Sequence, residues 1–221
     1  MTEVLLRFEE RKQEIEIYFE HITDFLDKDA IVLFPDHRVK SLSIDLEHIL
    51  LSNLFLLLYN LVESSISGAI ESIYKEMLAH AVSYDEIKPT IRMEILDHVR
   101  KNVNTKKFVE SVEDLVIDIL KYYPKSTELF SGNVDQEEIK KMAQKYGFSA
   151  HTDARKTQNG EKLKTIKNRR NELAHGFKSF QECGEERTFQ EMKSIKDECL
   201  LYIEQILKNI DAFLKNKTYL K

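Results

Sequence analysis

The feature that most constrains this chain is a nearly unbroken apolar pattern that begins after Ser43 and continues through Val62. Apolar residues then recur at Ile66, Ile70 and Ile73, which is the spacing of one helical face. A segment that is apolar on almost all sides predicts one long helix in the middle of a bundle. The 221 residues include only 3 Pro and 6 Gly, so residues that end helices are few. The predicted fold class is therefore all-α.

Further segments are predicted to form helices around this core. Apolar residues recur along one face of residues 3–27 and of residues 188–214. Shorter helices are expected at Ile91–Asn102, Phe108–Tyr122, Gln136–Tyr146 and Glu161–His175. Asp135 is placed to cap the helix at Gln136–Tyr146 and Gly147 to end it, and Gly176 is placed to end the helix at Glu161–His175. Residues 149–160 are expected to form a loop. We expect one domain over residues 1–221, with about 89–160 as an inserted or elaborated helical region.

The charge distribution limits where a nucleic acid would bind. The net charge of −5 argues against a protein that coats nucleic acid over its whole surface. Residues 155–178, however, carry eight basic and two acidic side chains, a local net charge of +6. The two cysteines have no companions at zinc-ligand spacing, and the most apolar run, Ile49–Tyr59, is shorter than the roughly 20 residues that span a bilayer. We therefore expect a cytoplasmic protein with no metal site and no membrane segment.

Arg170 is the first candidate functional residue. The apolar face of helix 161–175 is marked by Leu163, Ile166, Leu173 and Phe177. Arg170 falls on the same face, so it is expected to point inward, where only a carboxylate, a phosphate or carbonyl groups replace its lost hydration. Glu63 and Asn60 in the central helix are the candidate partners. The alternative is a purely structural ion pair between Arg170 and Glu63 that fixes the helix register.

His175 is the second candidate, at the end of the same helix. Histidine changes charge near neutral pH, which suits general acid/base catalysis. Asn171, four residues earlier, shares its helical face and is placed to orient the ring or hold a phosphate oxygen. Arg170 and His175 stand roughly 140° apart on a regular helix. They converge only if the last turn unwinds or a second copy of the chain completes the pocket; otherwise His175 is a capping residue.

These residues resemble a known family. Arg170-Asn171-x-x-x-His175 is similar to the R-x4-6-H signature of the HEPN superfamily, with the polar residue that commonly follows the Arg. The segments 59–64 (YNLVES), 130–135 (FSGNVD), 145–148 (KYGF) and 173–176 (LAHG) resemble the MAE-type branch of HEPN nucleases. The resemblance therefore covers most of the chain. It implies an up-and-down helical bundle of the HEPN type, here with extra short helices before the motif helix.

The resemblance also implies an activity: a metal-independent endoribonuclease without cofactors, with its composite site at the seam of a homodimer. Such proteins often serve as toxins or phage-defence effectors, which implies RNA as substrate and an antitoxin as a further partner. His175 would act on the ribose 2′-OH or the leaving 5′-oxygen, Arg170 would bind the scissile phosphate, and Asn171 would support them. Glu63 and Asn60 would assist from the central helix. Basic residues that would guide the strand are Lys162, Lys164, Lys167 and Arg169.

Two other readings stay open. Many HEPN proteins are non-catalytic, so the chain is alternatively a helical interaction module in which Arg170 pairs with Glu63 and His175 caps a helix. A metallohydrolase that uses His151, Asp153 and His175 has little support, because the metal-binding spacing HxxxH does not occur.

Overall fold

The structure, a computed structural model, describes residues 1–27, 31–41, 43–104, 118–130 and 132–221. Its α-helices are α1 (Thr2–Asp27), α2 (Ile44–Ala79), α3 (Pro89–Asn102), α6 (Ser126–Leu129), α7 (Gln136–Tyr146), α8 (Ala154–Thr157), α9 (Glu161–Ala174), α10 (Phe180–Glu185) and α11 (Phe189–Lys215). Short 3-10 helices cover Tyr84–Glu86, Ile119–Tyr122 and Gln158–Gly160, and two strands are β1 (Ile31–Leu33) and β2 (Val39–Ser41). The prediction of an all-α fold is confirmed.

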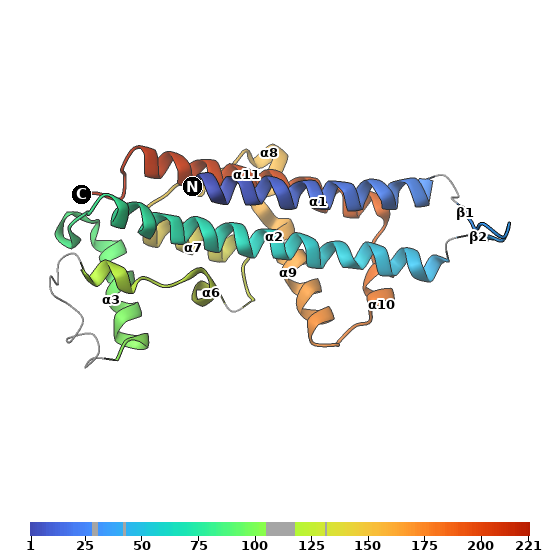
Figure 1. The fold of residues 1–221 in the computed structure, drawn as a ribbon, viewed down its shortest axis with the longest axis horizontal. Coiled ribbons are helices and arrows are strands. Elements are labelled where there is room, and N and C mark those ends of the chain that lie inside the picture. Colours follow the sequence, from blue (N-terminus) through green and yellow to red (C-terminus); the bar gives the residue numbers. More distant parts are fainter. Residues whose placement is uncertain (28–30, 42, 105–117, 131) are drawn as a thin grey trace.

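The central helix of the bundle is α2, as its apolar pattern predicts. It begins where the Ser43 hydroxyl accepts a hydrogen bond from the Leu46 backbone N–H at 3.3 Å. Along the longest axis α1, α2 and α11 run side by side, while α9 and α10 lie across them (Figure 1). By length and composition α2 would also be able to cross a membrane, but 56% of its most apolar window is buried inside the bundle. Its contacts with α1, α9, α10 and α11 make it the core helix.

The closing helix α11 also follows its predicted pattern. Its expected apolar stripe is buried throughout and comprises Met192, Ile195, Cys199, Tyr202, Ile206, Ile210 and Phe213. The helix begins after Thr188, whose hydroxyl accepts from the Glu191 N–H while the Glu191 carboxylate accepts from the Thr188 N–H. This reciprocal capping fixes the start of the helix.

The middle of the chain differs in part from expectation. As predicted, Asp135 caps α7 and Gly147 ends it with a positive φ of 86°. The expected loop at 149–160 contains the short helix α8 and a 3-10 turn. Most of the helix predicted at Phe108–Tyr122 lies outside the described residues. The region about 89–160 supplies α3, α6, α7 and α8, and its status as an insertion stays a prediction.

Helix α10 was not predicted, although it makes one of the tightest contacts in the fold. It packs on the first half of α2, where Gly184 lies directly against the carbonyl group of His48. A side chain at position 184 would overlap that carbonyl oxygen. The six-residue helix is too short to show a hydrophobic period, so its sequence carried no signal.

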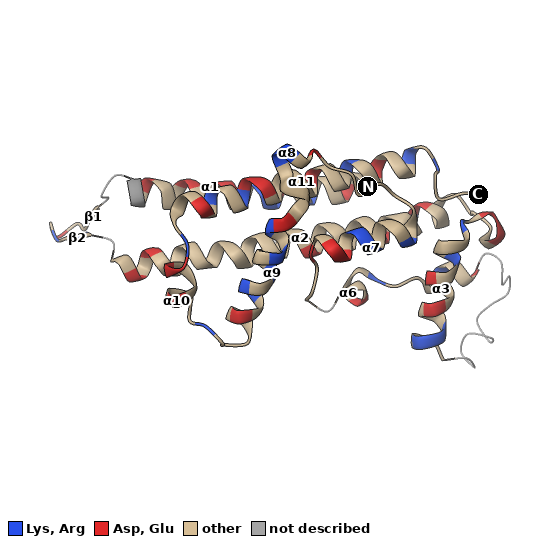
Figure 2. Cartoon of the chain, turned by 180° about the vertical axis from the view of Figure 1, so that it is seen from behind, with Lys and Arg blue, Asp and Glu red and all other residues tan. Residues whose placement is uncertain are grey.

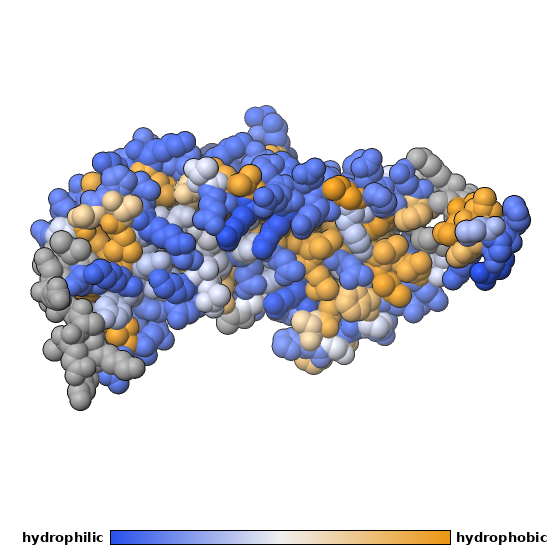
Figure 3. All heavy atoms as spheres, in the orientation of Figure 1, coloured by the Kyte–Doolittle hydropathy of each residue, from blue (hydrophilic) through white to orange (hydrophobic). Residues whose placement is uncertain are grey.

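Apolar side chains also remain on the surface. The hairpin β1–β2 extends from one end of the bundle, and Ile31, Leu33 and Val39 on it are exposed. Apolar residues also gather over the first half of α2, between α1 and α10 (Figure 3). Leu46 and Ile49 in this half are 41% and 37% exposed. These surfaces have no covering element in the described parts of the chain.

Candidate functional site

Helix α9 carries the motif and ends where the sequence predicts. Leu163, Ile166 and Leu173 are buried and attach the helix to α2. At its C-terminus the Gly176 N–H donates to the Leu173 carbonyl at 3.2 Å, and the next N–H donates to the Glu172 carbonyl at 2.9 Å. With Gly176 at a φ of +68°, this is a Schellman motif. The last three residues of the motif thus form a regular helix end.

Phe177 does not belong to the apolar face, contrary to expectation. Its side chain is 79% exposed, because the positive φ at Gly176 turns the chain away from the helix before it. Its ring centroid lies 5.7 Å from that of His175. An exposed aromatic ring therefore stands beside the candidate catalytic histidine.

Arg170 is half-buried, and its partner is not the one predicted. Its guanidinium carbon lies 4.5 Å from the centre of the Tyr59 ring, and Nη1 donates to Asn171 Oδ1 at 2.9 Å. No ion pair joins Arg170 to Glu63, although the structure describes both residues. The predicted pair is therefore wrong, because the Tyr59 ring, one turn earlier on α2, lies under the guanidinium and the Glu63 carboxylate is engaged elsewhere.

Glu63 instead holds the loop that precedes α7. Its Oε1 accepts a hydrogen bond from the Gly132 N–H at 3.2 Å and lies 3.5 Å from the Tyr59 hydroxyl, which donates to it. The Tyr59 oxygen accepts from the Val134 N–H at 3.2 Å. Burial raises the pKa of Tyr59, so the hydroxyl stays protonated and able to donate. Tyr59 and Glu63 together attach residues 132–134 to the central helix.

Gly132 is placed against the Arg170 guanidinium by this network. A Cβ at position 132 would lie 2.7 Å from Arg170 Nη1, and the φ of +77° also favours glycine. Sequence reasoning assigned no role to Tyr59 or Gly132. The one available signal for Tyr59 was its position four residues before Glu63, which puts both on one helical face.

Asn60 and Asn171 have separate environments. Asn60 is exposed rather than buried among apolar residues, contrary to expectation, and its carbonyl oxygen accepts from Arg11 Nη1 at 3.0 Å. Asn171 joins Arg170 to the loop, since its Nδ2 lies 3.5 Å from Asn133 Oδ1. Asn171 is therefore placed to fix the guanidinium rather than the imidazole.

His175 is exposed at the helix end. Its N–H donates to the Asn171 carbonyl at 3.0 Å, a normal helical hydrogen bond, so the last turn does not unwind. The sequence allowed two arrangements that would bring His175 to Arg170, and the first of them, unwinding of the last turn of α9, is therefore wrong. Completion of the pocket by a second copy stays a prediction.

The basic residues near the motif are largely paired with carboxylates. Lys167 binds Asp135, and Arg169 binds Glu172 at 2.7 Å as well as Glu186. Figure 2 shows acidic and basic residues mixed along α9 and its neighbours. The strand-guiding role of Lys167 and Arg169 stays a prediction, although carboxylates pair with both charges in the free protein.

Two of the four predicted cations keep an open environment. Lys164 is exposed and Lys162 half-buried, and neither has an ion-pair partner among the described residues. Nor does a group of three or more His, Cys, Asp or Glu side chains that would hold a metal ion occur within the described ranges. His151, Asp153 and His175 are therefore not brought together.

Comparison with known protein families identifies the class. A family model described as MAE_28990-like HEPN matches residues 1–219. The chain belongs to the HEPN family. No curated protein and no solved structure matched this HEPN protein. HEPN domains often act as nucleases. The family match agrees with the resemblance seen in the motif segments of the sequence.

Proposed function

We propose that this HEPN protein is a metal-independent endoribonuclease. The observation that carries the proposal is the Arg170 guanidinium, which is half-buried on Tyr59 and has only neutral partners in the described structure. A guanidinium in such a place binds a phosphate with planar, charge-assisted hydrogen bonds. This observation favours catalysis over the interaction module, since the module needs Arg170 paired with Glu63.

The chemistry follows from the two residue types. His175 removes the proton from the ribose 2′-OH, the 2′-oxygen forms a bond to phosphorus, and the bond to the 5′-oxygen breaks. The leaving 5′-oxygen takes a proton from water, and Arg170 stabilises the charge that develops on the phosphate. The products are a 2′,3′-cyclic phosphate and a 5′-OH. DNA lacks the attacking hydroxyl and is expected to be inert.

A second copy of the chain completes the site in this proposal. Arg170 faces the central helix, whereas His175 and Phe177 are exposed at the end of α9. A two-fold axis near the end of α9 would bring His175 of one copy to Arg170 of the other and cover the Phe177 ring. In the same proposal the protein is a toxin or phage-defence effector, held in check by an antitoxin.

The first test is cleavage of labelled RNA in EDTA. Wild-type protein should cleave RNA but not DNA of the same sequence, and Arg170→Ala or His175→Ala should abolish cleavage. Asn168→Ala, an exposed change on the same helix, serves as the matched control and should retain most activity. Undiminished cleavage by either motif variant would contradict the proposal. Toxicity on expression should be lost in the same two variants.

The second test asks whether the site is shared between copies. Arg170→Ala and His175→Ala proteins are unfolded together, mixed in equal amounts and refolded. If Arg170 and His175 come from different copies, each mixed dimer has one intact site and one dead site. The mixture should then recover about a quarter of wild-type activity. No recovery, or a strictly monomeric protein in sedimentation equilibrium, would argue against a shared site.

A further inference from the structure

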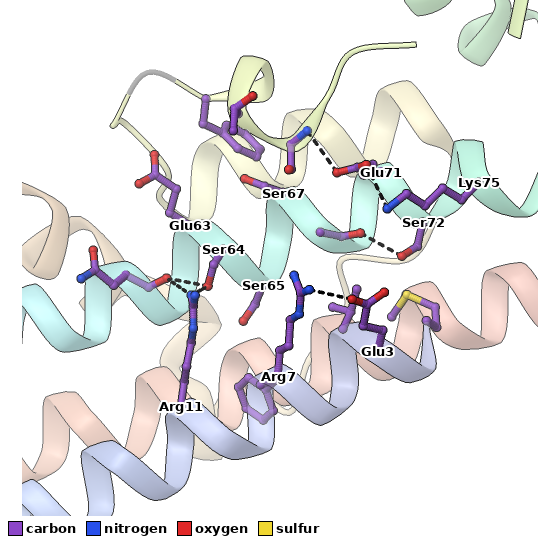
Figure 4. A pocket seen from close by; sticks show the side chains of 18 of the residues that line it. Glu3, Arg7, Arg11, Glu63, Ser64, Ser65, Ser67, Glu71, Ser72 and Lys75 are labelled. Atoms are coloured by element: carbon purple, nitrogen blue, oxygen red, sulfur yellow. Dashed lines mark hydrogen bonds and ion pairs between the residues drawn. The ribbon is translucent and has the colours of Figure 1, made fainter. Parts of the chain in front are cut away.

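A groove of about 970 Å³ runs between α1 and α2, and Glu63 is among the residues that line it. Its walls are the facing sides of the two helices, and part of α6 and the residue after it, Phe130, close one edge (Figure 4). Pockets that hold small organic ligands usually measure about 300–1,000 Å³. We call this space the α1–α2 groove. The RNase proposal makes no use of it.

Two arginines of α1 point into the groove one helical turn apart. Arg11 donates to the Asn60 carbonyl at 3.0 Å and to the Ser64 hydroxyl, and it has no carboxylate partner in the described chain. Arg7 forms an ion pair with Glu3 at 2.6 Å, but both side chains are about 70% exposed. Exposed pairs contribute little, so Arg7 stays able to bind another anion. Together the two guanidinium groups match a phosphate.

The serines of α2 give an independent sign of a ligand. Three of the five, Ser52, Ser64 and Ser72, donate to a carbonyl of the preceding helical turn. Ser65 and Ser67 line the groove, are only 4% exposed, and have no hydrogen-bond partner among the described residues. Figure 4 shows Ser65 directed toward α1, between Arg7 and Arg11. A hydroxyl that opens to the groove and has no partner in the described protein is free to hydrogen-bond to a bound polar group.

The rest of the lining restricts the kind of ligand. Three basic and five acidic residues line the groove, so its net charge is −2. A long polyanion such as an RNA strand is repelled by that balance, whereas a single phosphate beside two arginines is not. Hydrogen bonds from Lys75 and Ser126 outweigh burial and lower the pKa of Glu71, which is therefore an ionised acceptor for ligand hydroxyl groups at neutral pH.

We propose that the α1–α2 groove binds a small organic phosphate. Arg7 and Arg11 hold the phosphate, and the Ser65 hydroxyl donates to it. Glu71 accepts from sugar or polyol hydroxyls further along the groove. A sugar phosphate and a free nucleotide share this chemistry, and Phe130, half-buried at the edge, offers a face to a base if one is present. The site does not depend on RNA cleavage.

Titration calorimetry of the full-length protein tests the site with inorganic phosphate, ribose 5-phosphate, 5′-AMP and, as the uncharged control, ribose. Phosphate-bearing probes should bind and ribose should not. Tighter binding of 5′-AMP than of ribose 5-phosphate assigns the site to nucleotides, and equal binding assigns it to sugar phosphates. No binding of any phosphate at millimolar concentration would overturn the proposal.

Matched variants locate the binding. Arg11→Gln should weaken binding of ribose 5-phosphate by about tenfold or more. Arg100→Gln, on α3 and paired with Asp97 among the described residues, should leave it unchanged. Equal binding by the Arg11→Gln and wild-type proteins would show that the ligand sits elsewhere.

Ser65→Ala separates a ligand contact from a structural role. Because the Ser65 hydroxyl forms no hydrogen bond with another described residue, its removal should leave the melting temperature unchanged or raise it, while binding weakens several-fold. A lower melting temperature with unchanged binding would refute the assignment of Ser65. The same titrations on the His175→Ala protein keep the two proposals distinct, because this variant should bind phosphate but cleave no RNA. If the wild-type protein binds phosphate and also cleaves no RNA, only the RNase proposal is refuted.

Discussion

Replacement of Arg170 by Ala separates a structural from a catalytic arginine. Breaking a buried ion pair costs about 3–5 kcal/mol, because one charge is left uncompensated. In the structure Arg170 instead loses a stacking contact with Tyr59 and one neutral hydrogen bond to Asn171. For a half-buried guanidinium these interactions together contribute about 1–2 kcal/mol. The variant should therefore fold, with a modestly lower free energy of unfolding and no RNA cleavage.

Urea unfolding followed by circular dichroism measures the stability, and cleavage of labelled RNA in EDTA is measured on the same preparation. Protein concentration is held fixed, because a dimer's stability depends on it. Arg170→Lys is the matched variant: it keeps the charge but loses the planar guanidinium, so it should stay folded and cleave poorly. A loss above about 3 kcal/mol in Arg170→Ala would refute the reasoning about stability. Retained cleavage would refute the role in phosphate binding.

Two further predictions concern the fold around the site. Gly184→Ala should destabilise the protein by at least about 3 kcal/mol, because the new methyl group would overlap the His48 carbonyl; thermal melting beside an exposed Glu185→Ala control on the same helix checks this. Lys167→Gln should destabilise at neutral pH and less so in acid, which urea unfolding from pH 7 to pH 3 would reveal. Burial favours the protonated carboxyl of Asp135, but hydrogen bonds from Lys167 and from helix N–H groups lower its pKa below the usual value. The ion pair therefore stabilises the fold above the pKa of the unfolded carboxyl, about 3.9. This stabilisation is lost as the pH falls through the lower pKa of the folded protein. An equal deficit at every pH would contradict the pairing.

The sequence by itself determined the long helices and several of the helix ends. The apolar pattern after Ser43 specified a buried helix, and α2 is that helix. Asp135, Gly147 and Gly176 marked helix ends correctly, because caps depend on local backbone geometry and on a few neighbouring residues. The motif in α9 was also readable, together with the half-buried position of Arg170. These features are local or periodic, so they are present in the order of the residues.

Only the tertiary structure decided which residues meet. Helical spacing placed Arg170 on an inner face, but the choice of Tyr59 over Glu63 as its neighbour depends on how α9 crosses α2. The local charge of +6 likewise suggested a basic surface, until Asp135 and Glu186, distant in the sequence, proved to neutralise Lys167 and Arg169. Partners across helices are set by packing of the whole chain, since a side chain interacts with what the fold brings near it.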